Sequence, residues 1–234
     1  MSDWTILCDF DGTIALDDTT DTLLARFGRP GWEVLEADWR AGRIGSRDCM
    51  AGQVALLEMD RAELDAHLAQ RAIDPGFLEF ITLAHSRDIP IQVLSDGLDY
   101  AIHAILRRHG LDWLPVTSNR LEASGERNWR LEFPNSSATC RVSSGTCKCA
   151  LAARGQAARK RVLLIGDGAS DFCVAEAADF TFAKGKLIEH CRSKRIPHAA
   201  IEGFDDVLKL LPALIDGNLA AQQSMPLLLD PVLT

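Results

Sequence analysis

Three short apolar segments, each followed by acidic and small polar residues, constrain most strongly what this chain can fold into. They span residues 4–10, 89–94 and 161–165 of a 234-residue sequence, and the apolar residues between them recur at helical spacing. Short apolar runs bounded by turn-forming residues are typical of buried strands. Buried strands that alternate with helices predict an α/β fold, in which helices flank a parallel sheet.

The polar residues come where each predicted strand ends. Their sequences are DFDGT at residues 9–13, SDG at 95–97 and GDGASD at 166–171. Ligands of open parallel sheets bind outside the carboxyl ends of the strands. We therefore expect these three clusters, which are far apart in the sequence, to meet at one edge of the sheet.

That edge would gather four carboxylates, those of Asp9, Asp11, Asp167 and Asp171. Carboxylates that lie this close together repel one another unless a cation lies among them. Oxygen ligands without clustered histidines favour a hard cation such as Mg²⁺. An aspartate can also simply end a strand or cap a helix, but that alternative would have to hold for all three clusters at once.

Ser95 and Lys148 predict a phosphate-binding site beside these carboxylates. The Ser95 hydroxyl and the backbone amides of Asp96 and Gly97 can donate hydrogen bonds to phosphate oxygens, and a glycine lets the backbone approach closely. Lys148 adds a positive charge at the expected start of a helix, where anions are already favoured.

The rest of the chain predicts one insertion and a hairpin. Helical spacing over residues 18–87 predicts a helical block between the first two strands. Alternating apolar residues around a turn that contains Gly125 predict a β-hairpin over residues 121–133. Short strands are also expected at 113–117 and 179–183, and a last helix at 204–215.

Charge and hydropathy exclude several classes of function. Lys plus Arg is 25 and Asp plus Glu is 33, a net charge of −8, so the chain lacks the basic surface of a non-specific nucleic-acid binder or of a protein held on an anionic membrane. No apolar run approaches the ~18 residues that span a bilayer, and the first residues do not resemble a signal peptide. We expect a cytoplasmic monomer or homodimer without nucleic-acid or membrane partners.

Three of the seven cysteines, Cys140, Cys147 and Cys149, lie around Lys148. Three thiols can bind zinc, but this spacing lacks a Cys-x-x-Cys pair and a clear fourth ligand. Free thiols, or a disulfide between Cys140 and Cys147 formed under oxidation, are the alternatives.

The ordered set of DFDGT at 9–13, Ser95, Lys148 and GDGASD at 166–171 resembles the four motifs of the haloacid dehalogenase-like hydrolases. This resemblance implies a phosphatase with a Rossmann-like, three-layer core. The core would comprise residues 1–16 and 88–234, with a helical cap at 17–87.

The inserted block is similar to the cap of the phosphoserine-phosphatase-like branch of that family. Within the branch, the chain resembles the methionine-salvage phosphatases that act on 2-hydroxy-3-keto-5-methylthiopentenyl 1-phosphate. The features that carry this likeness are WRLEFP at 129–134, the cysteines at 140–149 and FDDV at 204–207.

The family resemblance also implies catalytic roles. Asp9 would attack phosphorus and form an aspartyl-phosphate. Asp11 would protonate the leaving alkoxide and then activate water. An acid two residues after the nucleophile favours phosphate-ester chemistry over dehalogenation, which has no alkoxide to protonate.

The remaining implied roles concern binding. Mg²⁺ would be held by the side chains of Asp9 and Asp167 and the backbone carbonyl of Asp11, with Asp171 as a further ligand or as an anchor behind the metal. The phosphoryl oxygens would be held by the Gly12 amide together with Ser95 and Lys148.

Specificity is expected to come from the cap. Phosphoserine phosphatases clamp their substrate with a Glu after the first motif and an Arg in the cap. An ungapped comparison puts Asp18 at the Glu position and Gln53 at the Arg position, and an amide cannot neutralise a carboxylate. Arg47, one to two helical turns from Gln53, is the alternative residue that would neutralise a substrate carboxylate.

The sequence therefore favours a Mg²⁺-dependent phosphomonoesterase for a small phosphate ester, sugar-like or keto-polyol in kind, with the methylthiopentenyl phosphate as the first named candidate. A phosphoserine- or phosphoethanolamine-type phosphatase is one alternative. The other is a catalytically idle phosphometabolite-binding protein on the same fold.

Overall fold

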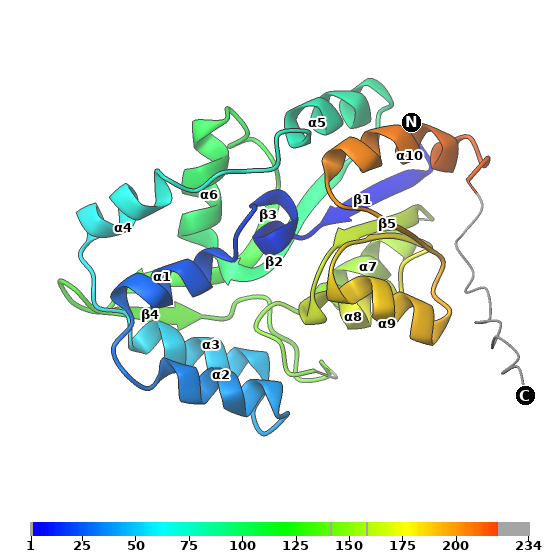
Figure 1. The fold of residues 1–234 in the computed structure, drawn as a ribbon. Coiled ribbons are helices and arrows are strands. Elements are labelled where there is room, and N and C mark those ends of the chain that lie inside the picture. The colour runs from blue at the N-terminus through cyan, green and yellow to red at the C-terminus, as the bar shows by residue number, and fades with distance from the viewer. Residues whose placement is uncertain (1, 141, 158, 220–234) are drawn as a thin grey trace, which may run out of the picture.

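A seven-stranded sheet forms the centre of the molecule (Figure 1). The computed structural model describes residues 2–140, 142–157 and 159–219. The strands are β1 (Trp4–Cys8), β2 (Ile91–Leu98), β3 (Val116–Ala123), β4 (Trp129–Glu132), β5 (Arg161–Gly166), β6 (Phe180–Ala183) and β7 (His198–Ala200). Their order is β4-β3-β2-β1-β5-β6-β7, and every pair is parallel except β3 and β4. The predicted α/β fold with its parallel sheet and β-hairpin is confirmed.

Strand β1 lies in the middle of the sheet and is apolar on both faces. Alternate residues of a strand point to opposite faces. Ile6 and Cys8 enter the core on one face and Leu7 enters the core on the other, and none is more than 3% exposed. In β5, Leu163 and Leu164 divide in the same way. Strands buried on both faces have nearly continuous apolar sequences, which is why the sequence predicted these two.

Helices cover both faces of the sheet and give the core three layers (Figure 1). On one face lie α5 (Phe77–Ser86), α6 (Asp99–Arg108) and α10 (Phe204–Ile215), and on the other lie α7 (Lys148–Ala157), α8 (Phe172–Ala175) and α9 (Lys186–Lys194). Helix α5 packs against α10 through aromatic rings, since the centroids of Phe77 and Phe80 lie 4.8 and 4.9 Å from that of Phe204. Within the described part of the chain, no helix has the length and apolarity that a membrane crossing requires.

The inserted block between β1 and α5 divides into two groups of helices. Its helices are α1 (Thr19–Phe27), α2 (Trp32–Arg40), α3 (Ser46–Ala55) and α4 (Arg61–Leu68). Helices α2 and α3 pack together, with α3 against β4, whereas α4 contacts α1 and α6 (Figure 1). We call α2 and α3 the α2–α3 lobe. The division into a core (1–16 and 88–234) and a cap (17–87) stays a prediction, and residues 220–234 of that core lie outside the described residues.

Candidate active site

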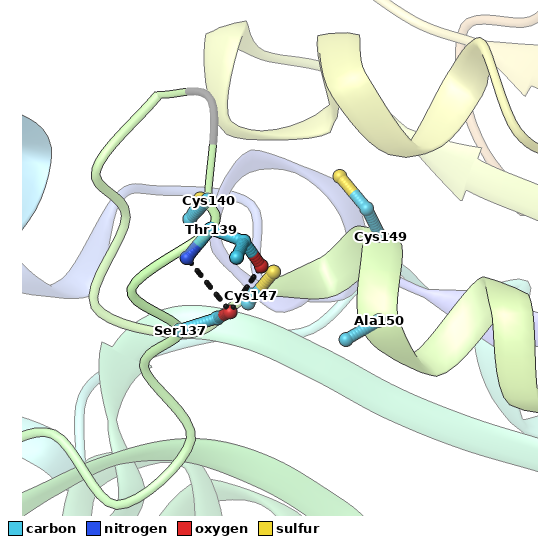
Figure 2. Close-up of a pocket in the computed structure, with 6 residues that line it drawn as sticks. All are labelled: Ser137, Thr139, Cys140, Cys147, Cys149 and Ala150. Carbon is cyan, nitrogen blue, oxygen red and sulfur yellow. Dashed lines mark hydrogen bonds between the residues drawn. The ribbon is translucent and has the colours of Figure 1, made fainter.

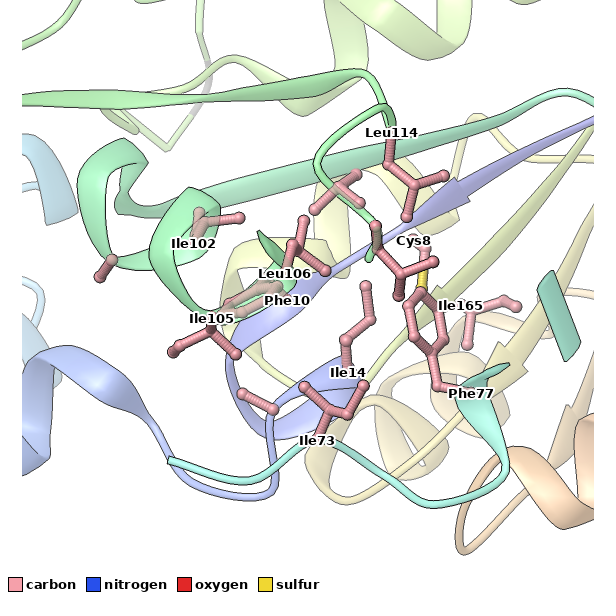
Figure 3. Close-up of a cluster of buried hydrophobic side chains, with 14 of the residues drawn as sticks. Cys8, Phe10, Ile14, Ile73, Phe77, Ile102, Ile105, Leu106, Leu114 and Ile165 are labelled. Carbon is pink, nitrogen blue, oxygen red and sulfur yellow. The ribbon is translucent and has the colours of Figure 1, made fainter. Parts of the chain in front are cut away.

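The first polar cluster forms an irregular turn directly after β1. Phe10 and Ile14 are both 0% exposed, and they point into the core among residues of α6 and Phe77 (Figure 3). These two apolar side chains anchor the turn at the edge of the sheet. Gly12 has a φ of +73°, and a Cβ placed there would lie 2.6 Å from Oδ2 of Asp167. Glycine is therefore required where the first and third clusters meet.

Lys148 lies at the centre of the buried site. Its Nζ is 2.8 Å from Oδ1 of Asp9 and 2.7 Å from Oδ1 of Asp171, and its side chain is only 1% exposed. Burial by itself would lower the pKa of Lys148, but the carboxylates of Asp171 and Asp9 raise it well above its ordinary value. The ammonium therefore stays charged and joins the first cluster to the third.

The carboxylates outnumber the positive charge beside them. Asp9, Asp167 and Asp171 each offer an oxygen within 4.8 Å of the other two. Burial and the nearby Asp171 raise the pKa of Asp9, and the same two causes raise the pKa of Asp167 to about 6. When all three carboxylates are ionised, they and the Lys148 ammonium carry a net charge of −2 at this point. An oxygen-only donor set with this charge suits a divalent hard cation such as Mg²⁺.

Asp171 already has partners on both of its oxygens. Oδ1 accepts from Lys148, while Oδ2 accepts from the backbone N–H groups of Asp167 at 3.2 Å and Gly168 at 3.4 Å. A Cβ on Gly166 would lie 2.4 Å from Oδ2 of Asp171. The third cluster is thus folded around this carboxylate, which is 0% exposed.

Asp11 and the second cluster face each other. Oδ1 of Asp11 accepts from the backbone N–H of Thr19 at 2.8 Å, and Oδ2 lies 3.5 Å from the hydroxyl of Ser95. A Cβ on Gly97 would lie 2.4 Å from Oδ2 of Asp11. Burial raises the pKa of Asp11, although hydrogen bonds from Thr19 oppose it. The three predicted clusters and Lys148 therefore lie together, as expected from the strand ends.

The side chain of Asp96 points away from this group. Its Oδ2 accepts from the hydroxyl of Ser46 at 2.8 Å, and its Oδ1 accepts from the N–H of Thr146 at 2.7 Å and from Asn119 at 3.2 Å. Only the backbone amide of Asp96 is left for the predicted role with phosphate. Sequence reasoning missed Ser46, Asn119 and Thr146, because isolated polar residues in three separate segments carry no recognisable spacing.

The three cap candidates take different positions. Asp18 caps α1 by accepting from the N–H of Asp21 at 3.0 Å. Gln53 is 3% exposed and donates to Glu36 within the α2–α3 lobe at 3.2 Å. Arg47 is exposed and lies 3.3 Å from Asp48.

The predicted cysteine segment borders a small cavity next to the start of α7 (Figure 2). The cavity has a volume of about 230 Å³ and is lined by Ser137, Thr139, Cys140, Cys147, Cys149 and Ala150. No disulfide joins any of the seven cysteines, all of which are described. In the described part of the chain, Asp9, Asp167 and Asp171 form the one group of three or more His, Cys, Asp or Glu side chains placed to share a metal ion, so the thiols are not arranged as a zinc site.

The thiols nevertheless lie near one another in pairs, Cys140 with Cys147 and Cys149 with Cys173, close enough to affect each other's pKa. Sγ of Cys140 also lies 3.1 Å from the hydroxyl of Ser144. Burial opposes ionisation of Cys140, but its hydrogen bonds with Ser144 hold the pKa below the ordinary value of a thiol.

Known proteins resemble this chain in both sequence and fold. The family model of the haloacid dehalogenase-like hydrolases matches residues 6–176. A protein of Exiguobacterium sp. named 2-hydroxy-3-keto-5-methylthiopentenyl-1-phosphate phosphatase is 30% identical over 205 residues, which are 86% of this chain and 94% of that protein. Its namesake in Brevibacillus brevis is 28% identical over 88% of this chain and 94% of the relative.

Solved structures extend this likeness to the whole architecture. A phosphoserine phosphatase with an analogue of a phospho-aspartyl intermediate superimposes with a TM-score of 0.69, covering 89% of this chain and 99% of that one. A phosphoserine phosphatase with bound substrate gives a TM-score of 0.68. Both are 19% identical to this chain, so they establish the shared fold alone.

Proposed function

Because the chain belongs to the haloacid dehalogenase-like hydrolase family and is a phosphatase, we propose that it hydrolyses small phosphomonoesters with Mg²⁺ through an aspartyl-phosphate on Asp9. The observation that carries this proposal is the buried contact of Lys148 with Asp9 and Asp171. It sits at the sheet edge where the strand-end clusters converge, and the net negative charge around it suits a divalent cation.

Asp9 is suited to be the nucleophile. Its Oδ1 is held by Lys148 and by the backbone N–H of Phe10, both at 2.8 Å, so we assign the attack to Oδ2. In the first step Oδ2 bonds to phosphorus and the bond from phosphorus to the ester oxygen breaks. In the second step water attacks the same phosphorus, inorganic phosphate leaves, and the Asp9 carboxylate is restored.

Asp11 is suited to move the protons of both steps. Burial raises its pKa, which favours the protonated form that the leaving alkoxide needs. After the first step the Asp11 carboxylate takes a proton from the attacking water. Its Oδ2 lies beside Ser95 and Gly97, where the phosphoryl group would be bound.

The remaining residues bind the phosphoryl group and the metal. Lys148, the Ser95 hydroxyl and the Gly12 amide would hold phosphoryl oxygens. Asp9, Asp167 and the backbone carbonyl of Asp11 would hold Mg²⁺, which when bound would neutralise charge on the phosphoryl oxygens. We assign Asp171 the anchoring role, because both of its oxygens already accept hydrogen bonds.

For the substrate, we favour a sugar-like or keto-polyol phosphate, with 2-hydroxy-3-keto-5-methylthiopentenyl 1-phosphate first among the candidates. The names of the relatives at 28–30% identity support this choice. Phosphoserine is the second candidate, favoured by the shared fold. It would need a cation for its carboxylate, but Gln53 is neutral and bonded to Glu36, and Arg47 is exposed. Residues 17–87 would act as the cap that sets this preference.

The test is phosphate release from a panel of phosphomonoesters, each with Mg²⁺ and with a chelator. The panel contains the methylthiopentenyl phosphate, phosphoserine, phosphoethanolamine and several sugar phosphates. We expect turnover that the chelator abolishes and that is strongest on the keto-polyol compound. Strongest turnover on phosphoserine would overturn the substrate assignment, and no turnover from folded protein with Mg²⁺ would favour the idle binding protein.

A further inference from the structure

A buried polar network connects the α2–α3 lobe to the two segments that carry the proposed phosphate-binding residues. Asp96, next to Ser95, is its centre and is 9% exposed. One carboxylate oxygen accepts from the hydroxyl of Ser46, the first residue of α3, and the other accepts from the N–H of Thr146, two residues before Lys148. A single carboxylate in β2 thus joins α3 to the segment before α7.

Asn119, in β3, completes the core side of this network. It is 0% exposed, and its amide group donates to both the backbone carbonyl and the carboxylate of Asp96. Its carbonyl oxygen accepts from the hydroxyl of Thr146 at 3.2 Å. A Cβ on Gly145 would lie 2.6 Å from that oxygen. Asp96 therefore has two core donors that keep its place even without Ser46.

The start of α3 makes further contacts at the same position. The backbone N–H of Arg47 donates to the carbonyl of Ser143 at 3.2 Å, and a Cβ on Gly45 would lie 2.7 Å from the Cβ of Ser143. Helix N-termini carry partial positive charge and favour carboxylates. The orientation of α3 toward Asp96 follows that rule, so the contact is favourable in charge as well as in shape.

We propose that Ser46 is a positioning residue for the phosphatase reaction: through Asp96 it docks the α2–α3 lobe against the segments that carry Ser95 and Lys148. This inference rests on the proposed function and adds a residue that positions the lobe without touching the reacting atoms. Removing the hydroxyl leaves Oδ2 of Asp96 without that donor, and a hydrogen bond to a charged acceptor is stronger than a neutral one.

The experiment compares Ser46→Ala with Ser46→Thr, which keeps a hydroxyl. The matched control is Ser86→Ala, because the exposed Ser86 hydroxyl donates to the Leu83 carbonyl within its own helix. For each protein, kcat and KM are measured on the best ester of the panel, with the inhibition constant of inorganic phosphate. We expect Ser46→Ala to lower kcat/KM about tenfold, Ser46→Thr to restore it, and Ser86→Ala to match the wild type.

The inhibition constant of inorganic phosphate distinguishes a positioning effect of Ser46 from damage to the phosphate-binding site itself. Asn119 and Thr146 still hold Asp96 in Ser46→Ala, so the inhibition constant should change by less than about twofold. The proposal is overturned if Ser46→Ala keeps wild-type kcat/KM, if Ser46→Thr is equally slow, or if phosphate inhibition weakens in parallel with turnover.

Hydrogen exchange tests the docking independently of activity. Loss of the Ser46 contact should speed exchange of the Arg47 amide, which is bonded to Ser143 in the docked lobe. A wild type that turns over no phosphomonoester would contradict the proposed function, whereas exchange that is unchanged in Ser46→Ala would contradict the docking.

Discussion

At the scale of single residues, the buried lysine explains why the carboxylates of the site can stay close together. Removing a charge from water is costly, and a buried carboxyl group becomes protonated unless a partner compensates. Lys148 supplies that partner for Asp9 and Asp171 at once. Burial and the nearby Asp171 still raise the pKa values of Asp9 and Asp167, that of Asp167 to about 6, although Lys148 opposes both shifts. One ammonium therefore does not offset all three carboxylates, which favours a cation beside Asp9 and Asp167.

The proposed nucleophile, Asp9, gives the first prediction. Asp9→Asn keeps the shape of the side chain but removes the charge and the attacking oxygen, so turnover of every ester in the panel should fall at least a thousandfold. Asp216→Asn, at an exposed carboxylate on the far end of α10, is the control and should keep full activity. Phosphate release is the measurement. Full activity in Asp9→Asn would show that another group attacks phosphorus.

Gly97 gives a second prediction at this scale. An added methyl group would lie 2.4 Å from Oδ2 of Asp11 and 3.0 Å from the hydroxyl of Ser95, so one or both must move. A displacement of about 1 Å can cost about a hundredfold in rate, and we expect Gly97→Ala to lose about that much in kcat. Gly125→Ala, in the hairpin turn, should behave as the wild type, because its added methyl group would meet Asn128 at an ordinary contact distance of 3.5 Å. Unaltered kcat in Gly97→Ala would show that Asp11 tolerates the shift.

At the scale of elements, the sequence predicted the positions of strands best where both faces of the strand are buried, and those of helices best where the helix is long. The last helix has the predicted bounds, 204–215. Strand β3 joins two segments that the sequence suggested separately, a strand near Val116 and the first arm of the hairpin. Strand β7 was missed, because a three-residue strand, His198–Ala200, carries no periodicity. Contacts between segments, such as that of α3 with β4, depend on tertiary packing that periodicity does not contain.

The pairing of α1 with α4 depends on a buried histidine, His67, which is 5% exposed. The Thr22 hydroxyl donates to the Thr19 carbonyl, so it accepts from Nε2 of His67 at 2.9 Å. Nδ1 of His67 is buried and has no hydrogen-bond partner among the described residues. Burial, with Arg71 and Arg26 nearby, lowers the pKa of His67. The neutral ring is therefore the form that the folded protein favours.

The pH dependence of stability follows from this. The unfolded chain takes up a proton near pH 6.5, whereas the folded chain does so only at lower pH, so the free energy of unfolding falls as the pH drops below about 6.5. We expect urea unfolding to show a larger loss between pH 7.5 and 5.5 for the wild type than for His67→Gln. His85→Gln, at an exposed histidine, should resemble the wild type. Equal losses in His67→Gln and the wild type would contradict the assignment.

The segment before α7 gives a prediction about oxidation. Cys140 and Cys147 both line the cavity in Figure 2, and Lys148 follows Cys147 directly. Hydrogen peroxide would take one hydrogen from each thiol, leaving a disulfide and two waters. Joining the sulfurs shifts the start of α7, so activity should fall several-fold and return on reduction. Cys140→Ser should resist peroxide while Cys191→Ser stays sensitive. Activity that peroxide leaves unchanged in the wild type would contradict this.

At the scale of the whole molecule, the strand order decides which parts of the site the sequence reveals. Because β1 lies between β2 and β5, the clusters after these strands converge, and parallel-sheet topology predicts that from sequence alone. Asp9, Asp11, Ser95, Asp167 and Asp171 were singled out in this way, and Lys148 by its place at the expected start of a helix. The residues that hold Asp96 in place, Ser46, Asn119 and Thr146, were not singled out. They meet only after the α2–α3 lobe and the loops have packed. Where a ligand binds is thus set by topology, and how it is held is set by packing.

The same convergence predicts that a divalent cation stabilises the entire fold. The carboxylates of Asp9, Asp167 and Asp171 come from segments that are separate in the unfolded chain, so Mg²⁺ would bind the native state preferentially. At a hundred times the dissociation constant, such binding adds about 2.7 kcal/mol to the free energy of unfolding. For a chain of this length that corresponds to a rise in Tm of about 5–10 °C. Scanning calorimetry with MgCl₂, against a chelator with KCl at equal ionic strength, measures it.

Asp167→Asn is the variant that makes this measurement specific to the site. It removes one negative charge beside Asp171, so the metal-free variant should be at least as stable as the wild type, while its response to Mg²⁺ should largely disappear. Asp65→Asn, at an exposed carboxylate on α4, should keep the full wild-type response. A wild-type Tm that is the same with Mg²⁺ and with chelator would contradict the site. A rise that persists undiminished in Asp167→Asn would place the ion elsewhere on this acidic chain.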